Sequence, residues 1–180
     1  MRSLSFGAVA LGCLVSAGFG LTSMAHAAVT KTEGANVAFT AVGPGGLKIV
    51  GTTNQLSVKD SGSDYVVSVP LATLDTKIEL RNKHMREKYL QTDKFPNAEI
   101  VVAKADVKPG SADANGTLKI HGKEKAIRFH YEAKKNGAVT QVTSTFKVNI
   151  EDFGIEKPSF MGATVKSDVD VAAAFAITEN

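Results

Sequence analysis

The sequence predicts an all-β protein with one inserted helix, built as an up-and-down antiparallel barrel of eight strands. The C-terminal run, residues 163–177, alternates apolar and polar side chains, and the run before it, residues 139–150, does the same. Glycine, proline, asparagine and aspartate divide the preceding sequence into shorter runs of this kind. Long strands with one apolar face need long partners, which a closed barrel supplies. A two-sheet sandwich is the alternative, but it would leave the ends of the two long strands unpaired.

The first 27 residues have the order of a secretory signal peptide. Arg2 is followed by an apolar region, residues 4–24, and by a small-x-small site that ends at Ala27. We expect cleavage after Ala27, which leaves one domain, residues 28–180, in the periplasm with no stable membrane insertion. A membrane anchor is the alternative, because the apolar region is about as long as a short spanning helix.

The composition narrows the classes of partner. The chain has 21 Lys and Arg against 18 Asp and Glu, a net charge of +3, which becomes +2 when Arg2 is removed. This balance predicts neither nucleic acid nor an anionic membrane as a partner. The only cysteine, Cys13, lies in the signal segment, so the remaining domain has no disulfide and no cysteine metal site.

The first three strands are expected at residues 37–42, 47–58 and 65–71. Residues 43–46 are Gly-Pro-Gly-Gly, which predicts a tight turn, and a polar loop separates the second strand from the third. Gly51 interrupts the second strand, which is typical of a bulge or a bend.

A helix is expected at residues 77–90, where the alternation stops. Thr76 and Glu79 have the spacing of a capping box, and Ile78, Met85 and Tyr89 fall on one helical face. The other faces carry a basic stripe, made of Arg81, Lys83, His84, Arg86 and Lys88.

Strands resume beyond Pro96 and continue to the end of the chain. They are expected at residues 98–107, 116–121, 125–133, 139–150 and 163–177, which with the first three makes eight. Gly154, between the last two, is expected to need a special backbone angle.

Three groups of residues form recognisable motifs, in order and spacing, along the chain. They are Leu74, Asp75, Thr76, Arg81, Asn82, His84, Met85, Lys94, Phe95, Pro96 and Ile100, then residues 116–122 with Lys125, and then Asp152, Phe153, Gly154 and Ile155 before the last strand. These motifs resemble the YceI-like family of periplasmic polyisoprenoid-binding proteins. The resemblance covers nearly all of residues 28–180 and implies an extended lipocalin-like barrel of eight antiparallel strands whose lumen holds a long isoprenoid tail. The family's usual His-Ser pair and later histidine near the start are absent, where this chain has Asn36, Val37 and then Gly43.

The residues on the inward faces of the strands are the candidate ligand-binding residues. An eight-stranded barrel has an interior that either is filled by side chains or holds one small ligand. Alternation alone favours a packed core, and the resemblance favours a ligand. The predicted lumen residues are Phe39, Leu47, Ile49, Val67, Val69, Ile100, Val102, Leu118, Ile120, Ile127, Phe129, Phe146, Val148 and Phe175.

Arg81 and His84 are the candidate contacts for a polar ligand head group. If the helix covers the barrel mouth, both side chains can meet a polar or phosphorylated group there. A solvated helix face is the other interpretation. We expect no metal site, because no second histidine or carboxylate lies at ligand spacing, and no catalytic residues, because no nucleophile motif is present.

The sequence therefore predicts a periplasmic protein that binds or carries an isoprenoid lipid, a quinone or a polyprenyl compound, with no other cofactor. The alternative is a structural or protein-interaction module with a packed core and a basic surface helix. An enzyme acting on an isoprenoid ranks last. An open barrel can also pair with a second copy to shelter its mouth, so a homodimer is a further expectation.

Overall fold

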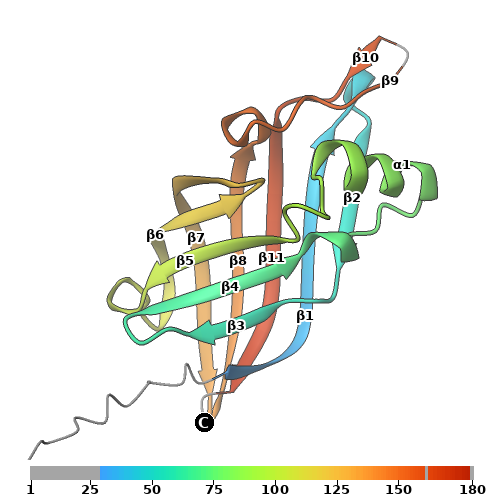
Figure 1. The fold of residues 1–180 in the computed structure, drawn as a ribbon. Coiled ribbons are helices and arrows are strands. Elements are labelled where there is room, and N and C mark those ends of the chain that lie inside the picture. The colour runs from blue at the N-terminus through green and yellow to red at the C-terminus, as the bar shows by residue number, and fades with distance from the viewer. Residues whose placement is uncertain (1–28, 161, 179–180) are drawn as a thin grey trace, which may run out of the picture.

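A computed structural model describes residues 29–160 and 162–178, and the predicted signal segment lies outside this range. It confirms the predicted fold class, a curled antiparallel sheet with one short helix (Figure 1). The strands of the main sheet are β1 (Val29–Val42), β2 (Lys48–Thr53), β3 (Ser57–Asp60), β4 (Asp64–Pro70), β5 (Asn97–Ala103), β6 (Gly110–Ile120), β7 (Lys123–Asn136), β8 (Val139–Asn149) and β11 (Asp168–Thr178).

The sheet closes because β1 forms pairs along both of its edges. One edge pairs with β11, from Lys31 opposite Thr178 to Ala41 opposite Val169. The other edge pairs with β2 and then with β3, which continue one another along β1. Counted as one interrupted strand, β2 and β3 give a ring of eight strands, as predicted. Closure pairs both edges of β1, and the outer edge of β2 carries the isolated bridge between Thr52 and Asp75.

The C-terminal strand is shorter than predicted. Residues 163–164 form β10 (Ala163–Thr164), which pairs with β9 (Ser159–Phe160) in a separate hairpin. The barrel strand begins only at Asp168 and runs to Thr178. The alternation crosses this boundary without a break, because Val165 and Val169 both face the interior that the hairpin helps to cover. In Figure 1 the hairpin projects from the end of the barrel beside α1.

The end of the barrel opposite this hairpin is filled by a packed core. Val102, Ala114, Tyr131 and Ala133 are buried there, and Tyr65, Val107, Ala112, Phe129 and Val142 pack against them. The Tyr131 hydroxyl donates to the Lys108 carbonyl and accepts from the Lys108 N–H, which fastens the loop across this end. We call this the closed end.

The predicted helix is shorter than expected and is capped differently. α1 (Glu79–His84) is followed by a π-helical turn, Met85–Tyr89, and Ile78 is the N-cap with no side-chain hydrogen bond. The predicted Thr76 capping box is wrong. Both the N–H and the hydroxyl of Thr76 donate to Oδ1 of Asn82, at 2.8 Å each, so the residue is bound to a side chain and not to the helix backbone.

Asn82 and Asp75 fasten the helix to the barrel wall. Asn82 is 4% exposed and its amide nitrogen donates to Asp75 Oδ1 at 2.9 Å. The backbone of Asp75 pairs with Thr52 of β2 in an isolated bridge. Hydrogen bonds from Lys77 and Asn82 hold the pKa of the Asp75 carboxyl below its usual range. This carboxylate therefore stabilises the fold at neutral pH, and that contribution is lost as the pH falls through the lowered pKa.

Two further details differ from the sequence prediction. Gly51 is neither a bulge nor a bend, since it stays in register opposite Phe39. β6 begins at Gly110, six residues before the predicted start, because Ala112 and Ala114 face the closed end and alternate with polar residues. Gly154 adopts φ 70°, which confirms the special backbone angle expected there.

Asn82→Ala should lower the free energy of unfolding by about 2 kcal/mol, because two buried donors of Thr76 lose their acceptor. Urea unfolding followed by circular dichroism measures this change. Asn97→Ala, at an exposed position on β5, is the control and should change the value by less than about 0.5 kcal/mol. Equal midpoints for the two variants would contradict the anchoring role of Asn82.

Candidate functional site

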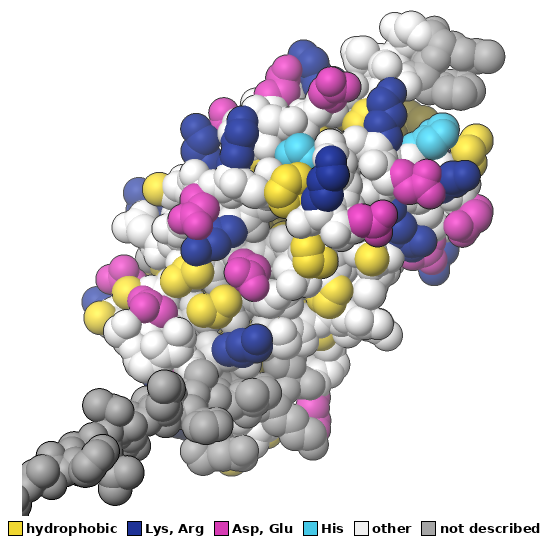
Figure 2. Space-filling view, in the orientation of Figure 1, with side chains coloured by type: hydrophobic (Ala, Val, Ile, Leu, Met, Phe, Trp, Pro, Cys, Tyr) yellow, Lys and Arg dark blue, Asp and Glu magenta, His cyan; other side chains and the backbone are white. Residues whose placement is uncertain are grey.

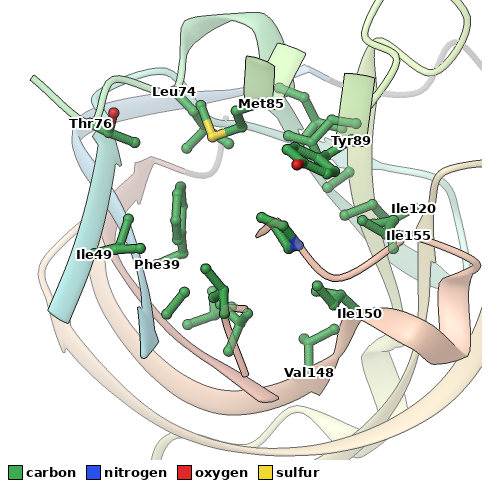
Figure 3. Close-up of a pocket in the computed structure, with 18 of the residues that line it drawn as sticks. Phe39, Ile49, Leu74, Thr76, Met85, Tyr89, Ile120, Val148, Ile150 and Ile155 are labelled. Carbon is green, nitrogen blue, oxygen red and sulfur yellow. The ribbon is translucent and has the colours of Figure 1, made fainter. Parts of the chain in front are cut away.

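The half of the barrel beside α1 contains a cavity of about 700 Å³ that opens to solvent. Its wall is formed by β1, β2, β4, β5, β6, β8 and β11, and its mouth by the β1–β2 turn, the helix and the segment around β9 and β10. Figure 3 shows Phe39, Ile49, Met85, Tyr89 and Val148 pointing from these elements toward one central space. A volume of this size lies in the range that holds a single small ligand.

Ten of the fourteen predicted lumen residues line this cavity. They come from both sides of the ring, which confirms the inward faces assigned to these strands. Their contact with a ligand stays a prediction. They are Phe39, Leu47, Ile49, Val67, Val69, Ile100, Leu118, Ile120, Phe146 and Val148.

The other four predicted lumen residues do not line it. Val102 and Phe129 belong to the packed core of the closed end. Phe175 pairs with Val142, which packs against the same core, and Ile127 packs on the cluster around Leu118. Alternation assigns a residue to the inside of a barrel but does not say at which level along the axis it lies.

The floor of the cavity is an aromatic contact between its wall and the closed end. The rings of Phe129 and Phe146 meet edge to face with their centroids 6.5 Å apart. Phe146 faces the cavity, whereas Phe129 packs on Tyr131 below it, at 6.2 Å. The predicted long tube is therefore open over one part of its length and solid over the rest.

Many lining residues were not among the predicted ones. Strand alternation would have found Val37, Ala41, Val165, Val169, Val171 and Ala173, which share faces with predicted residues. No signal in the sequence places the residues of the helix and the loops at the mouth, because only the folded chain brings them there. This second group includes Pro44, Leu74, Thr76, Ile78, Leu80, Met85, Tyr89, Leu90, Ile155, Pro158, Ser159 and Ala163.

The lining side chains that carry a polar group gather at one end. Arg81, His84 and Tyr89 belong to the helical turns, Thr76 lies just before them, and Ser159 belongs to β9. The Ser159 N–H donates to the Tyr89 hydroxyl at 3.4 Å, which joins β9 to the helix. The strands of the main sheet contribute only apolar side chains to the cavity. The cavity is therefore amphipathic, with a polar mouth and an apolar interior.

Arg81 and His84 both line this mouth, as the prediction required if the helix covers it. His84 is exposed and Arg81 is half-buried, so neither is sealed from water. Arg86, further along the helix, instead donates to the Leu74 carbonyl at 3.0 Å and helps hold the helix in place. Of the basic stripe, Arg81 and His84 thus lie at the mouth, and Arg86 fastens the helix.

Gly51 makes room for one wall of the cavity. A Cβ at this position would lie 2.2 Å from Cε1 of Phe39, on the opposite residue of β1. The ring of Phe39 therefore lies across β2 in the place that a side chain would occupy. The glycine is a site of close approach, which allows an aromatic ring to line the cavity.

A hydrogen-bonded chain of Ser111, His130 and Asp113 lies on the outer face of β6 and β7. Ser111 Oγ is 3.1 Å from His130 Nε2, and His130 Nδ1 is 2.8 Å from Asp113 Oδ1. His130 and Arg128 lower the pKa of the Asp113 carboxyl. The order matches a hydrolase triad, but acyl transfer needs oxyanion donors in a site that excludes water. These side chains are exposed and lie outside the cavity. Their role is therefore structural, since their hydrogen bonds link β6 to β7.

Within residues 29–160 and 162–178, no group of three or more His, Cys, Asp or Glu is placed to hold a metal ion. Of the helices in the same range, none is long and apolar enough to span a membrane.

The comparisons with known proteins point to one family. The model of the YceI-like domain matches residues 21–177. A UPF0312 protein of Pseudomonas putida (strain W619) is 29% identical over 123 residues, 64% of each chain, and one of Pseudomonas fluorescens (strain SBW25) is 30% identical over 67% of each. The chain thus spans about two thirds of the length of these relatives.

Solved structures show the same fold. A polyisoprenoid-binding domain from Saccharophagus degradans superposes with a TM-score of 0.70 at 16% identity, over 84% of this chain and 98% of that one. BcnA from Burkholderia cenocepacia gives 0.68 at 17% identity, over 80% and 96%.

Gly51→Ala should lower the melting temperature by several degrees, because the added Cβ overpacks against Phe39 at a cost of about 1–3 kcal/mol. Differential scanning fluorimetry measures the shift. In the double variant Gly51→Ala, Phe39→Leu, the shorter side chain should recover part of the loss. If Gly51→Ala melts like the parent protein, the Phe39 ring does not occupy this position.

Proposed function

The chain belongs to the family of YceI-like domain proteins, and on that premise we propose that it binds one isoprenoid lipid, such as a quinone or a polyprenyl compound. The observation that carries the proposal is the amphipathic cavity of about 700 Å³. The Saccharophagus degradans domain with the same fold is described as polyisoprenoid-binding, which supports the same class of ligand.

The interior favours a hydrocarbon chain. Its walls are aliphatic and aromatic, from Phe39 on β1 to Val171 on β11. Each methylene moved from water into such a site gains about 0.8 kcal/mol, so a long tail reaches high affinity without directed hydrogen bonds. The packed closed end limits the depth, which sets an upper bound on the length of tail that can be buried.

The mouth favours a polar head group. In the proposed orientation the tail lies against the strands and the head group lies beside Arg81 and His84, the cationic and imidazole groups at the opening. Arg81 can form paired hydrogen bonds to a phosphate, and both residues can donate to a quinone oxygen. Neither group needs to be desolvated, because the mouth is open to water.

Binding or carriage explains the site better than catalysis does. Among the described residues that line the cavity there are no paired carboxylates, no cysteine and no nucleophile with an adjacent base. A periplasmic location accords with the secretory pattern of residues 1–27. The alternative of an interaction module with a solid core accounts for the closed end alone, since the other half of the barrel is hollow.

The direct test is extraction of the protein purified from the periplasm without detergent. Organic solvent should release an isoprenoid in about equimolar amount, identified by mass spectrometry. Empty protein that also fails to take up quinones or polyprenyl lipids saturably from detergent micelles would refute the proposal.

Ala173→Phe should reduce lipid uptake at least about tenfold, because the ring would occupy the cavity that Ala173 lines. The matched control is Ala172→Phe, at the preceding residue of β11, whose side chain is exposed on the outer face. This variant should bind the lipid like the parent protein. Binding is measured by titration with a fluorescent prenyl lipid, and circular dichroism checks that both variants fold. Equal affinities for the two variants would place the ligand elsewhere.

A further inference from the structure

Large apolar side chains surround the mouth of the cavity and face water. Leu47 is 59% exposed, Ile78 47% and Leu80 60%, and all three line the opening. They are three of the five large hydrophobic residues that are exposed in the described part of the chain, so this exposure is concentrated at one place. Val50, a fourth of these exposed residues, lies on β2 shortly after Leu47. Leu47, Ile78 and Leu80 are called the apolar rim.

Cations accompany the apolar rim. Lys48 follows Leu47, and Lys166 donates its N–H to the Val42 carbonyl, opposite Lys48, so both lie at the same strand ends. Arg81 and Lys83 stand on α1 beside Leu80. Figure 2 shows basic, histidine and hydrophobic side chains together over this region, with carboxylates among them.

Among the described residues, the rim cations, Lys48, Arg81, Lys83 and Lys166, lack the counter-ions that several cations on the barrel wall have. On the wall, Lys104 pairs with Asp60, Arg128 with Asp113, Lys134 with Glu132 and Lys147 with Asp170. Within the described residues, the side chains of Lys48, Arg81, Lys83 and Lys166 form no ion pair. The helical segment, residues 77–90, has five Lys and Arg against two Glu. The helical segment at the mouth is therefore more positive than the chain as a whole, whose net charge is near neutral.

We propose that the mouth docks on the surface of an anionic lipid bilayer, with the apolar rim inserted and the rim cations at the lipid phosphates. The proposal rests on the proposed function, because it supplies the route by which a membrane lipid reaches the cavity. Apolar side chains flanked by cations have the pattern of an interfacial membrane-binding surface. Each cation near an anionic surface adds attraction, which salt screens.

A bilayer fits this surface better than a second copy of the chain does. The apolar rim lies at an opening that leads into the apolar cavity, so a docked mouth would let a tail pass inward without crossing water. Two copies joined mouth to mouth would place unpaired cations of one rim against those of the other, which is repulsive.

The test is sedimentation of the protein purified from the periplasm with vesicles of phosphatidylcholine containing 30% phosphatidylglycerol. The protein should bind these vesicles, and bind at least about tenfold more weakly to pure phosphatidylcholine or at 0.5 M salt. The double variant Lys48→Glu, Lys83→Glu should lose at least about tenfold in vesicle affinity. Neither lysine lines the cavity, so uptake of a prenyl lipid from detergent micelles should be unchanged.

The matched control is Lys59→Glu, Lys108→Glu, which changes the net charge equally at the barrel end away from the mouth. It should bind vesicles like the parent protein. Equal loss in both double variants, or equal binding to neutral vesicles, would overturn the docking proposal. So would a rim-dependent dimer in light scattering without vesicle binding. Failure of micelle uptake in the parent protein would instead refute the proposed function.

Discussion

The structure depends on the pairing of β1 with β11, which turns a curled sheet into a ring. These strands lie at opposite ends of the described sequence, and their register, from Lys31 with Thr178 to Ala41 with Val169, is shifted between Glu33 and Asn36. Without this pairing, β1 and β11 would each expose an edge and the inward faces would have no common interior. The cavity, its polar mouth and the attachment of the helix to β2 all depend on the closed ring.

The interior is divided because the two ends of the ring carry different residues. At the closed end, Tyr131 and Phe129 lie among small residues of β6, where a Cβ on Gly116 would come within 3.1 Å of the Phe129 ring. At the other end the aliphatic side chains of β4, β5 and β11 are too short to meet across the ring. A barrel of this size can therefore be both a solid core, which supplies stability, and a binding site.

The fold was predictable because alternation and turn residues are local signals. The inward faces of β8 and β11 follow directly from Phe146, Val148 and Val171. β6 was missed in part, since Ser111, Asp113 and Asn115 are residues typical of turns and conceal the small inward alanines between them. The depth of each residue along the axis, which separates Phe146 from Phe129, and the mouth formed by the helix depend on contacts between distant segments, for which the sequence has no local pattern.

The strand that completes the ring is also the last barrel strand of the described sequence. Without β11, β8 and β1 would each keep one unpaired edge, and the contact between Phe39 and Val171 closes a loop of more than a hundred residues. Such long-range pairing is slow to form. Closure of the ring is therefore expected to lag behind the pairing of neighbouring strands such as β6 and β7, and the cavity forms only when the ring has closed.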